Sequence, residues 1–136
     1  MYEFFEHTAD LGLRIQAASL DALFVDAARG LFAAIVDGPE TVRPDRRIDI
    51  DIAGSDREYL LFDWLRELLF RFDADQLLFS RFDVKVTENS VQGSAWGEAI
   101  DPTRHVLSHE VKAITYHGLR VEREGEQWIA EVIVDI

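Results

Sequence analysis

The sequence predicts an α+β fold in which two helices pack on a largely antiparallel β-sheet. Two stretches carry apolar residues at the spacing of an α-helix, and most of the others alternate apolar and polar residues with the period of a strand. The strands come in consecutive runs and do not alternate one by one with helices, which favours an antiparallel sheet. The 136 residues are enough for one hydrophobic core, so we expect a single domain over residues 1–136.

The chain opens with a predicted hairpin and a helix. Residues 2–7 and 11–16 alternate in hydropathy on either side of a short connection at 8–10. Ser19 can cap a helix that begins at Leu20, because its hydroxyl can accept a hydrogen bond from a free backbone N–H of the first turn. Apolar residues then recur at helical spacing to Ile35, and a turn is expected at residues 37–39.

The middle of the chain predicts an edge strand followed by the strongest helix. Residues 47–53 alternate strictly, which places Asp49 and Asp51 on a solvated face opposite three isoleucines. The pattern Ser-x-x-Glu at 55–58 is typical of a capping box. A wide apolar stripe then runs from residue 60 to residue 72. Trp64 in this stripe is interpreted as a core residue.

The second half predicts a β-meander. Period-two patterns cover residues 78–87, 90–100, 111–117, 119–122 and 128–134. Turns are expected at Glu88–Asn89 and around Gly125.

Composition limits the classes of function. The net charge of −12 disfavours direct binding of RNA or DNA, and it suits a cation or a basic protein partner, although acidity also simply maintains solubility. The absence of cysteine excludes disulfides and thiolate metal sites. Without a signal-like N-terminus or a run of about 20 apolar residues, no membrane association is expected, and the cytoplasm is the expected location.

The two ends of the chain supply the candidate site. Asp10 lies between the first two predicted strands, and Asp135 lies at the tip of an apolar strand that runs to the last residue, Ile136. Carboxylate oxygens suit a hard cation such as Ca²⁺ or Mg²⁺. A simple turn-forming role is the competing interpretation for Asp10.

Other polar residues give weaker signals. Lys112 interrupts an apolar run, and its ammonium could either balance nearby acids or protect an edge strand from aggregation. His105 and His109 are expected in loops, and none of the four histidines forms a metal-ligand motif with another. No serine-hydrolase elbow, P-loop or dinucleotide fingerprint occurs, so the sequence does not predict an enzyme.

Four motifs taken together resemble the archease family. They are His-Thr-Ala-Asp at 7–10, Leu-Leu-Phe-Asp-Trp-Leu-Arg-Glu-Leu-Leu at 60–69, Val-Lys-Ala-Ile-Thr-Tyr-His at 111–117 and Val-Ile-Val-Asp-Ile at 132–136. The motifs are colinear over the whole chain and include its end, which makes a chance match improbable.

The resemblance implies a protein cofactor that activates the RNA-splicing ligase by promoting its guanylylation and turnover. It also implies a metal site, usually assigned calcium, which maps here onto Asp10, Asp135 and Ile136, with Ile136 contributing main-chain oxygen. His7 is given a supporting role beside the metal-bound carboxylates.

Two alternatives remain open. One is a metal-dependent hydrolase or transferase in which Asp10 and Asp135 hold a cation and His7 or His117 acts as a general base. The other is a general chaperone-like modulator of nucleic-acid enzymes.

Overall fold

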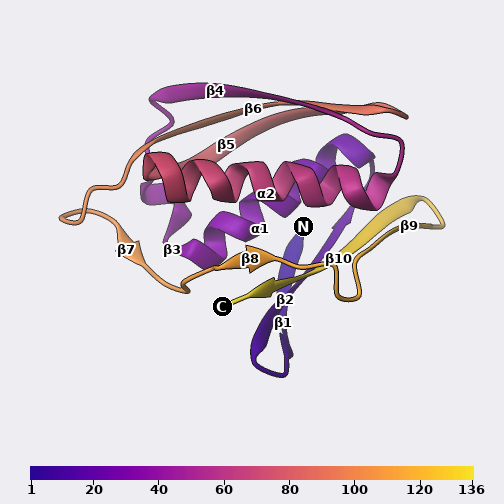
Figure 1. The fold of residues 1–136 in the computed structure, drawn as a ribbon, viewed down its shortest axis with the longest axis horizontal. Coiled ribbons are helices and arrows are strands. Elements are labelled where there is room, and N and C mark those ends of the chain that lie inside the picture. The colour runs from indigo at the N-terminus through magenta and orange to yellow at the C-terminus, as the bar shows by residue number, and fades with distance from the viewer.

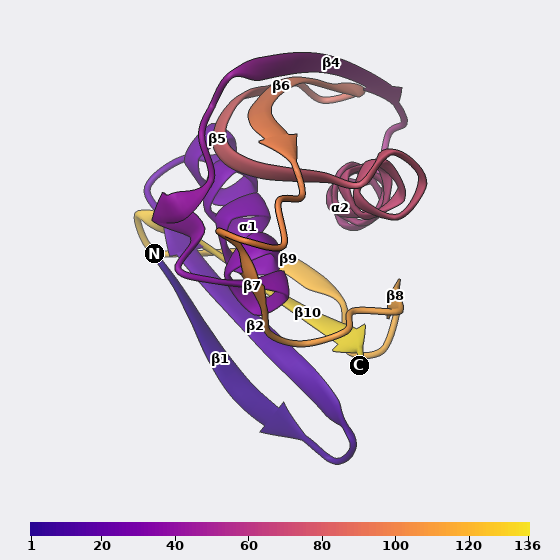
Figure 2. The same ribbon diagram turned by 90° about the vertical axis from the view of Figure 1, so that its left-hand side faces the viewer.

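Two antiparallel sheets enclose the helices in the computed structural model, which describes residues 1–136. The first helix, α1 (Leu20–Ile35), lies between a five-stranded sheet and a three-stranded sheet, and α2 (Arg57–Asp75) lies beside it (Figures 1 and 2). The α+β class with two packed helices is therefore confirmed. Neither helix combines the length and the hydrophobicity that a membrane span requires.

The five-stranded sheet brings the two ends of the chain together. Its order is β1 (Tyr2–His7), β2 (Asp10–Ala17), β10 (Gln127–Asp135) and β8 (Ala113–Ile114), and β9 (Arg120–Glu124) also pairs with β10. The first and last long strands are thus neighbours at the centre of one sheet. Their inward side chains are buried, and these are Leu13, Ile15, Ala17, Ala130, Val132 and Val134.

The three-stranded sheet has the order β4 (Arg46–Ala53), β6 (Ser90–Ala99) and β5 (Leu77–Val86). A separate ribbon pairs β3 (Val36–Asp37) with β7 (Val106–Leu107), and a single 3₁₀ turn covers Pro39–Thr41. The edge position predicted for residues 47–53 is confirmed.

The prediction that the second half of the chain forms one continuous β-meander is wrong. The hairpin of β5 and β6 and the hairpin of β9 and β10 around Gly125 are confirmed, but they lie in different sheets, since β8, β9 and β10 join β2. The strand predicted at 111–117 shrinks to Ala113–Ile114. Here the hydrogen bonds to β10 are supplied partly by irregular backbone, since the N–H groups of Lys112 and Thr115 donate to the carbonyls of Asp135 and Ile133.

Both helices begin at a side-chain cap. The Ser19 hydroxyl accepts a hydrogen bond from the N–H of Ala22, as predicted. The cap of α2 is Asp56 and not Ser55, because the Asp56 carboxylate accepts from the N–H groups of Glu58 and Tyr59. The predicted capping box is therefore wrong, and the Glu58 carboxylate instead accepts from the N–H of Val121 in β9.

Trp64 is the largest of the fully buried side chains in the core. Its indole N–H donates to the carbonyl of Phe24 in α1, at 3.1 Å, so the ring links the two helices without leaving a buried donor unpaired. The ring also packs on β6 at Gly93, where a Cβ atom would lie only 2.4 Å from Trp64 Cζ3. The prediction that Trp64 is a core residue is confirmed.

Candidate metal site at the chain ends

Strand register brings Asp10 and Asp135 to the same end of the two central strands. The β2–β10 pairing runs from Trp128 with Ala17 to Val134 with Leu11, and both strands extend one residue further. Directly opposed residues of antiparallel strands project from the same face. The fold therefore sets Asp10 and Asp135, from opposite ends of the sequence, each one residue beyond the pair of Leu11 and Val134.

A two-residue hairpin loop holds Asp10. His7 pairs with Asp10 across the loop formed by Thr8 and Ala9. Thr8 has a positive φ of 52°, a conformation that a β-branched residue rarely adopts. Backbone strain of this kind is concentrated at functional sites, where it fixes the direction of neighbouring groups.

His7 lies beside Asp10 but does not hydrogen-bond to it. The His7 Nδ1 atom is 4.0 Å from Asp10 Oδ2, which is an ion contact only when the imidazole is protonated. Both side chains are partly exposed, so the ring can reorient toward a ligand on the same face. This placement agrees with a supporting role for His7 and leaves that role a prediction.

The end of β10 is anchored on its other side by the segment around β8. The N–H of Lys112 donates to the carbonyl of Asp135 at 2.7 Å, and Thr115 donates to the carbonyl of Ile133 through both its N–H and its hydroxyl. The side chain of Ile136 packs partly buried against the core. The backbone at Asp135 and the side chain of Ile136 are thus held in place.

The side chain of Lys112 forms no ion pair with Asp10 or Asp135. It is exposed, and its ammonium makes no ion pair with a carboxylate. The structure therefore gives Lys112 a backbone role at Asp135, and charge balance by its ammonium stays a prediction.

The donor set fits a hard cation only if the chain end takes part. No group of three or more His, Cys, Asp and Glu side chains gathers anywhere in a geometry that could hold a metal. Asp10 and Asp135 would supply two carboxylates, and main-chain oxygen of Ile136 is the expected third donor. Oxygen donors of this type are those that Ca²⁺ and Mg²⁺ prefer, and a thiophilic metal has no ligand here.

Other acidic side chains on the outer face of the same sheet are paired with arginines. Arg14 lies between Glu3 and Glu131, and Arg120 also pairs with Glu131. Burial alone would raise the pKa of Glu131, but hydrogen bonds from Arg120 and Arg14 outweigh it, and the pKa lies below its usual value. By contrast, Asp135 has no ion-pair partner, and Asp10 has only His7.

Sequence reasoning missed a second polar cluster, on the loop that follows β6. His105 was expected in a loop, which is confirmed, but its side chain is completely buried. Its Nδ1 accepts from the N–H of Asp101, and its Nε2 lies 3.2 Å from a carboxylate oxygen of Glu98. Glu98 also accepts from the Arg104 guanidinium and from the N–H of Arg43.

The role of this cluster is to stabilise the fold. It ties the loop after β6 to the connection before β4, and the ion pair with Arg104 is the main cause that lowers the pKa of Glu98 to about 2. No standard sequence motif marks these residues, because residues 98–105 are completed by the N–H of Arg43 and the carbonyl of Thr41 from a distant segment.

Comparison with known proteins places the whole chain in one family. The family model of the archease protein family matches residues 2–136. The archease of Methanopyrus kandleri is 44% identical over 139 residues, covering 99% of both chains. The solution structure of protein 1598 of Methanobacterium thermoautotrophicum superimposes with a TM-score of 0.88 at 37% identity, covering 99% of this chain and 98% of that one.

A more distant structure shares the fold. The crystal structure described as an archease, possible chaperone, from Thermotoga maritima has a TM-score of 0.67 at 21% identity, and it covers 100% of this chain and 98% of that one. The family is one of protein cofactors and not of enzymes, as the sequence predicts. The chain therefore belongs to the archease family.

Proposed function

We propose that this chain is a cytoplasmic protein cofactor that activates the RNA-splicing ligase, and that its two ends hold a divalent cation, Ca²⁺ or alternatively Mg²⁺. The observation that supports the proposal is the pairing of Leu11 with Val134, which leaves Asp10 and Asp135 as the next residues at the end of the central strands. Membership of the archease family over residues 2–136 supports a role in assisting a protein partner.

In this proposal each residue has a distinct task. Asp10 and Asp135 neutralise the cation with their charges, and the carboxylate of Ile136 completes the oxygen donor set. His7 stays close enough to Asp10 to orient its carboxylate. The bound ion supplies concentrated positive charge at an otherwise acidic edge, which suits contact with phosphate oxygens of a nucleotide held by the ligase.

The acidity of the chain supports the choice of partner. An enzyme that binds RNA and GTP presents basic surface, and a chain with a net charge of −12 is attracted to such a surface while being repelled by RNA itself. The protein is therefore expected to act on the ligase and not on its nucleic-acid substrate.

The test is ligase guanylylation measured with labelled GTP, with and without this protein. Wild type should accelerate formation of the guanylylated ligase, and Asp10→Asn should lose most of that effect. Asp83→Asn is the matched control, because Asp83 is an exposed acid on the three-stranded sheet. Equal activation by wild type and Asp10→Asn would reject the chain-end site, and no activation by any form would reject the ligase as the partner.

A further inference from the structure

The outer edge of β4 is an unpaired strand edge. β4 pairs only with β6, over all eight of its residues and without a register shift. The opposite edge strand, β5, contains a register shift between Phe79 and Arg81 and is partly covered, since the Asp21 carboxylate accepts from the N–H of Val86. Among the usual protections of a sheet edge, β4 has charged side chains but neither irregularity nor covering.

The alternation of hydrogen bonds along the β4–β6 ladder shows which backbone groups of β4 point away from the sheet. The N–H of Gly54 donates to the carbonyl of Asn89 at 3.0 Å, one step beyond the pair of Ala53 and Ser90. Hydrogen-bonded and non-hydrogen-bonded pairs alternate along an antiparallel ladder. The even-numbered residues of β4 therefore bond to β6, and Arg47, Asp49 and Asp51 direct their N–H and C=O groups away from the sheet.

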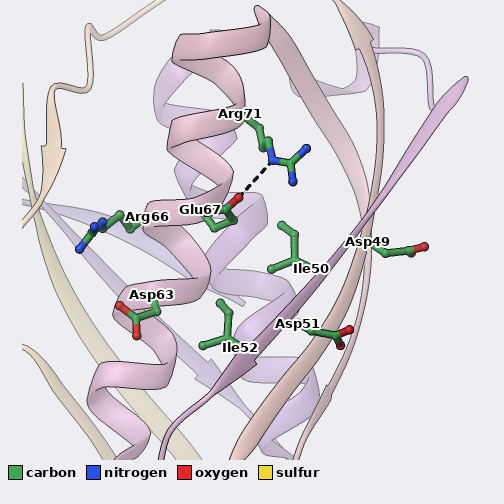
Figure 3. Close-up of a pocket in the computed structure, with 8 residues that line it drawn as sticks. All are labelled: Asp49, Ile50, Asp51, Ile52, Asp63, Arg66, Glu67 and Arg71. Atoms are coloured by element: carbon green, nitrogen blue, oxygen red, sulfur yellow. Dashed lines mark hydrogen bonds and ion pairs between the residues drawn. The ribbon is translucent and has the colours of Figure 1, made fainter.

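A groove of about 430 Å³ lies between this strand and α2. Figure 3 shows Ile50 and Ile52 pointing from β4 toward α2, whereas Asp49 and Asp51 point to the other face of the sheet. The far wall carries the ion pair of Glu67 and Arg71, with 3.1 Å between the charged atoms. The free backbone edge of β4 thus lies beside a groove with apolar side chains on β4 and charged side chains on α2.

The charges of β4 favour basic side chains on the outer face of an added strand. Asp49 and Asp51 point to the outer face of the sheet, whereas the groove side carries two carboxylates and two guanidiniums, those of Asp63, Glu67, Arg66 and Arg71 (Figure 3). Asp49 is engaged by Ser94 and Arg47, and these hydrogen bonds lower its pKa. Asp51 and Asp63 have no ion-pair partner.

We propose that β4 accepts an extended segment of a partner protein as an added strand, with alternating basic and apolar side chains. Backbone pairing would use the free groups of Arg47, Asp49 and Asp51. The basic side chains would lie on the outer face beside Asp51, where opposite charges across strands stabilise pairing. The apolar side chains would pack on Ile50 and Ile52 in the groove.

This surface is separate from the chain ends. β4 lies on the opposite side of the molecule from the C-terminus (Figures 1 and 2). The inference goes beyond ligase activation and does not depend on the metal site, because its test uses only the isolated protein.

The probe is a capped heptapeptide that alternates lysine and valine, titrated into the isotope-labelled protein and followed by NMR. Binding should shift resonances of β4 and of the facing residues of α2, and it should slow amide exchange at Asp49 and Asp51. A peptide with glutamate in place of lysine should not bind. Shifts centred elsewhere, or equal binding of both peptides, would overturn the proposal.

The deciding variant is Asp51→Pro, compared with Asp51→Ala. Both remove the charge, but only proline removes the outward N–H, and an edge strand tolerates proline where that N–H faces solvent. Asp51→Pro should bind the peptide about tenfold more weakly than Asp51→Ala, from the lost hydrogen bond and the clash of the ring. Unchanged melting of both variants shows that the fold is kept, and equal affinity would reject strand addition.

Analytical ultracentrifugation of the protein alone tests whether the β4 edge binds a second copy of the chain and not a partner protein. The wild type should be monomeric at the concentration of the titration. A dimer that Asp51→Pro dissociates would assign the edge to self-association and would overturn the proposed partner.

Discussion

Asp10 and Asp135 each lie one residue beyond the pair of Leu11 and Val134, at the end of the two central strands of the five-stranded sheet. Two like charges directly opposed on antiparallel strands repel each other and destabilise the pairing. A bound cation converts this repulsion into attraction, so the same pair links stability to metal.

Removing one of the two charges should therefore stabilise the metal-free protein. Asp135→Asn is expected to raise the free energy of unfolding by about 0.5 kcal/mol in the presence of a chelator. Calcium should stabilise the wild type by about 2.7 kcal/mol at a hundredfold excess over its dissociation constant, and the variant much less. Thermal melts with chelator and with Ca²⁺ measure both effects. An equal calcium shift in the two proteins would contradict the site.

The carboxylate of Ile136 should be needed for activation. A C-terminal extension converts that carboxylate into an amide, which removes a charged donor while β10 keeps its buried side chains. We expect the extended protein to melt normally with chelator but to lose calcium binding and ligase activation. An N-terminal extension of the same length is the control. Full activation by the C-terminally extended form would show that the chain end is not used.

Glu98 should make stability depend on pH in the acid range. Its pKa falls from 4.5 to about 2 on folding, chiefly through Arg104, so its contribution is complete above pH 4.5 and is lost as the pH falls toward 2. Glu98→Gln should cost about 2 kcal/mol of the free energy of unfolding at pH 7, and less at pH 3. Urea unfolding at the two pH values gives the difference, and a constant difference would mean that the carboxylate charge is unimportant.

Gly93 should be intolerant of any side chain. Its Cβ position is occupied by the ring of Trp64, so Gly93→Ala is expected to destabilise the protein by about 1–3 kcal/mol. Trp64→Phe provides space at this position but leaves a cavity. In the double variant the loss of unfolding free energy should be smaller than the sum of the two single losses, because the new methyl group at position 93 fills part of the cavity that Trp64→Phe creates. Strict additivity in a double-mutant cycle would show that the two residues do not compete for space.

Local sequence was sufficient for the elements whose determinants lie close together in the chain. The first helix occupies the predicted span because the Ser19 cap and the apolar spacing both act within a few residues. The alternation around Asp49 correctly predicted both the strand and its solvated face. The limits of this reasoning appear at α2, where two neighbouring residues, Ser55 and Asp56, could each cap the helix and only the three-dimensional path of the chain selects Asp56.

Tertiary structure decided which strands pair and which polar groups meet. Periodicity reports the face of a strand but not its neighbour, so the predicted meander missed the pairing of β10 with β2. His105 looks like an ordinary loop residue until β6 supplies Glu98. The sequence by itself determined that Asp10 and Asp135 are acids at the ends of two strands. Only the fold brought them to the same end of neighbouring strands, because the pairing of β2 with β10 buries Leu13 and Val132 together, and a slip of one residue would expose one of the two faces.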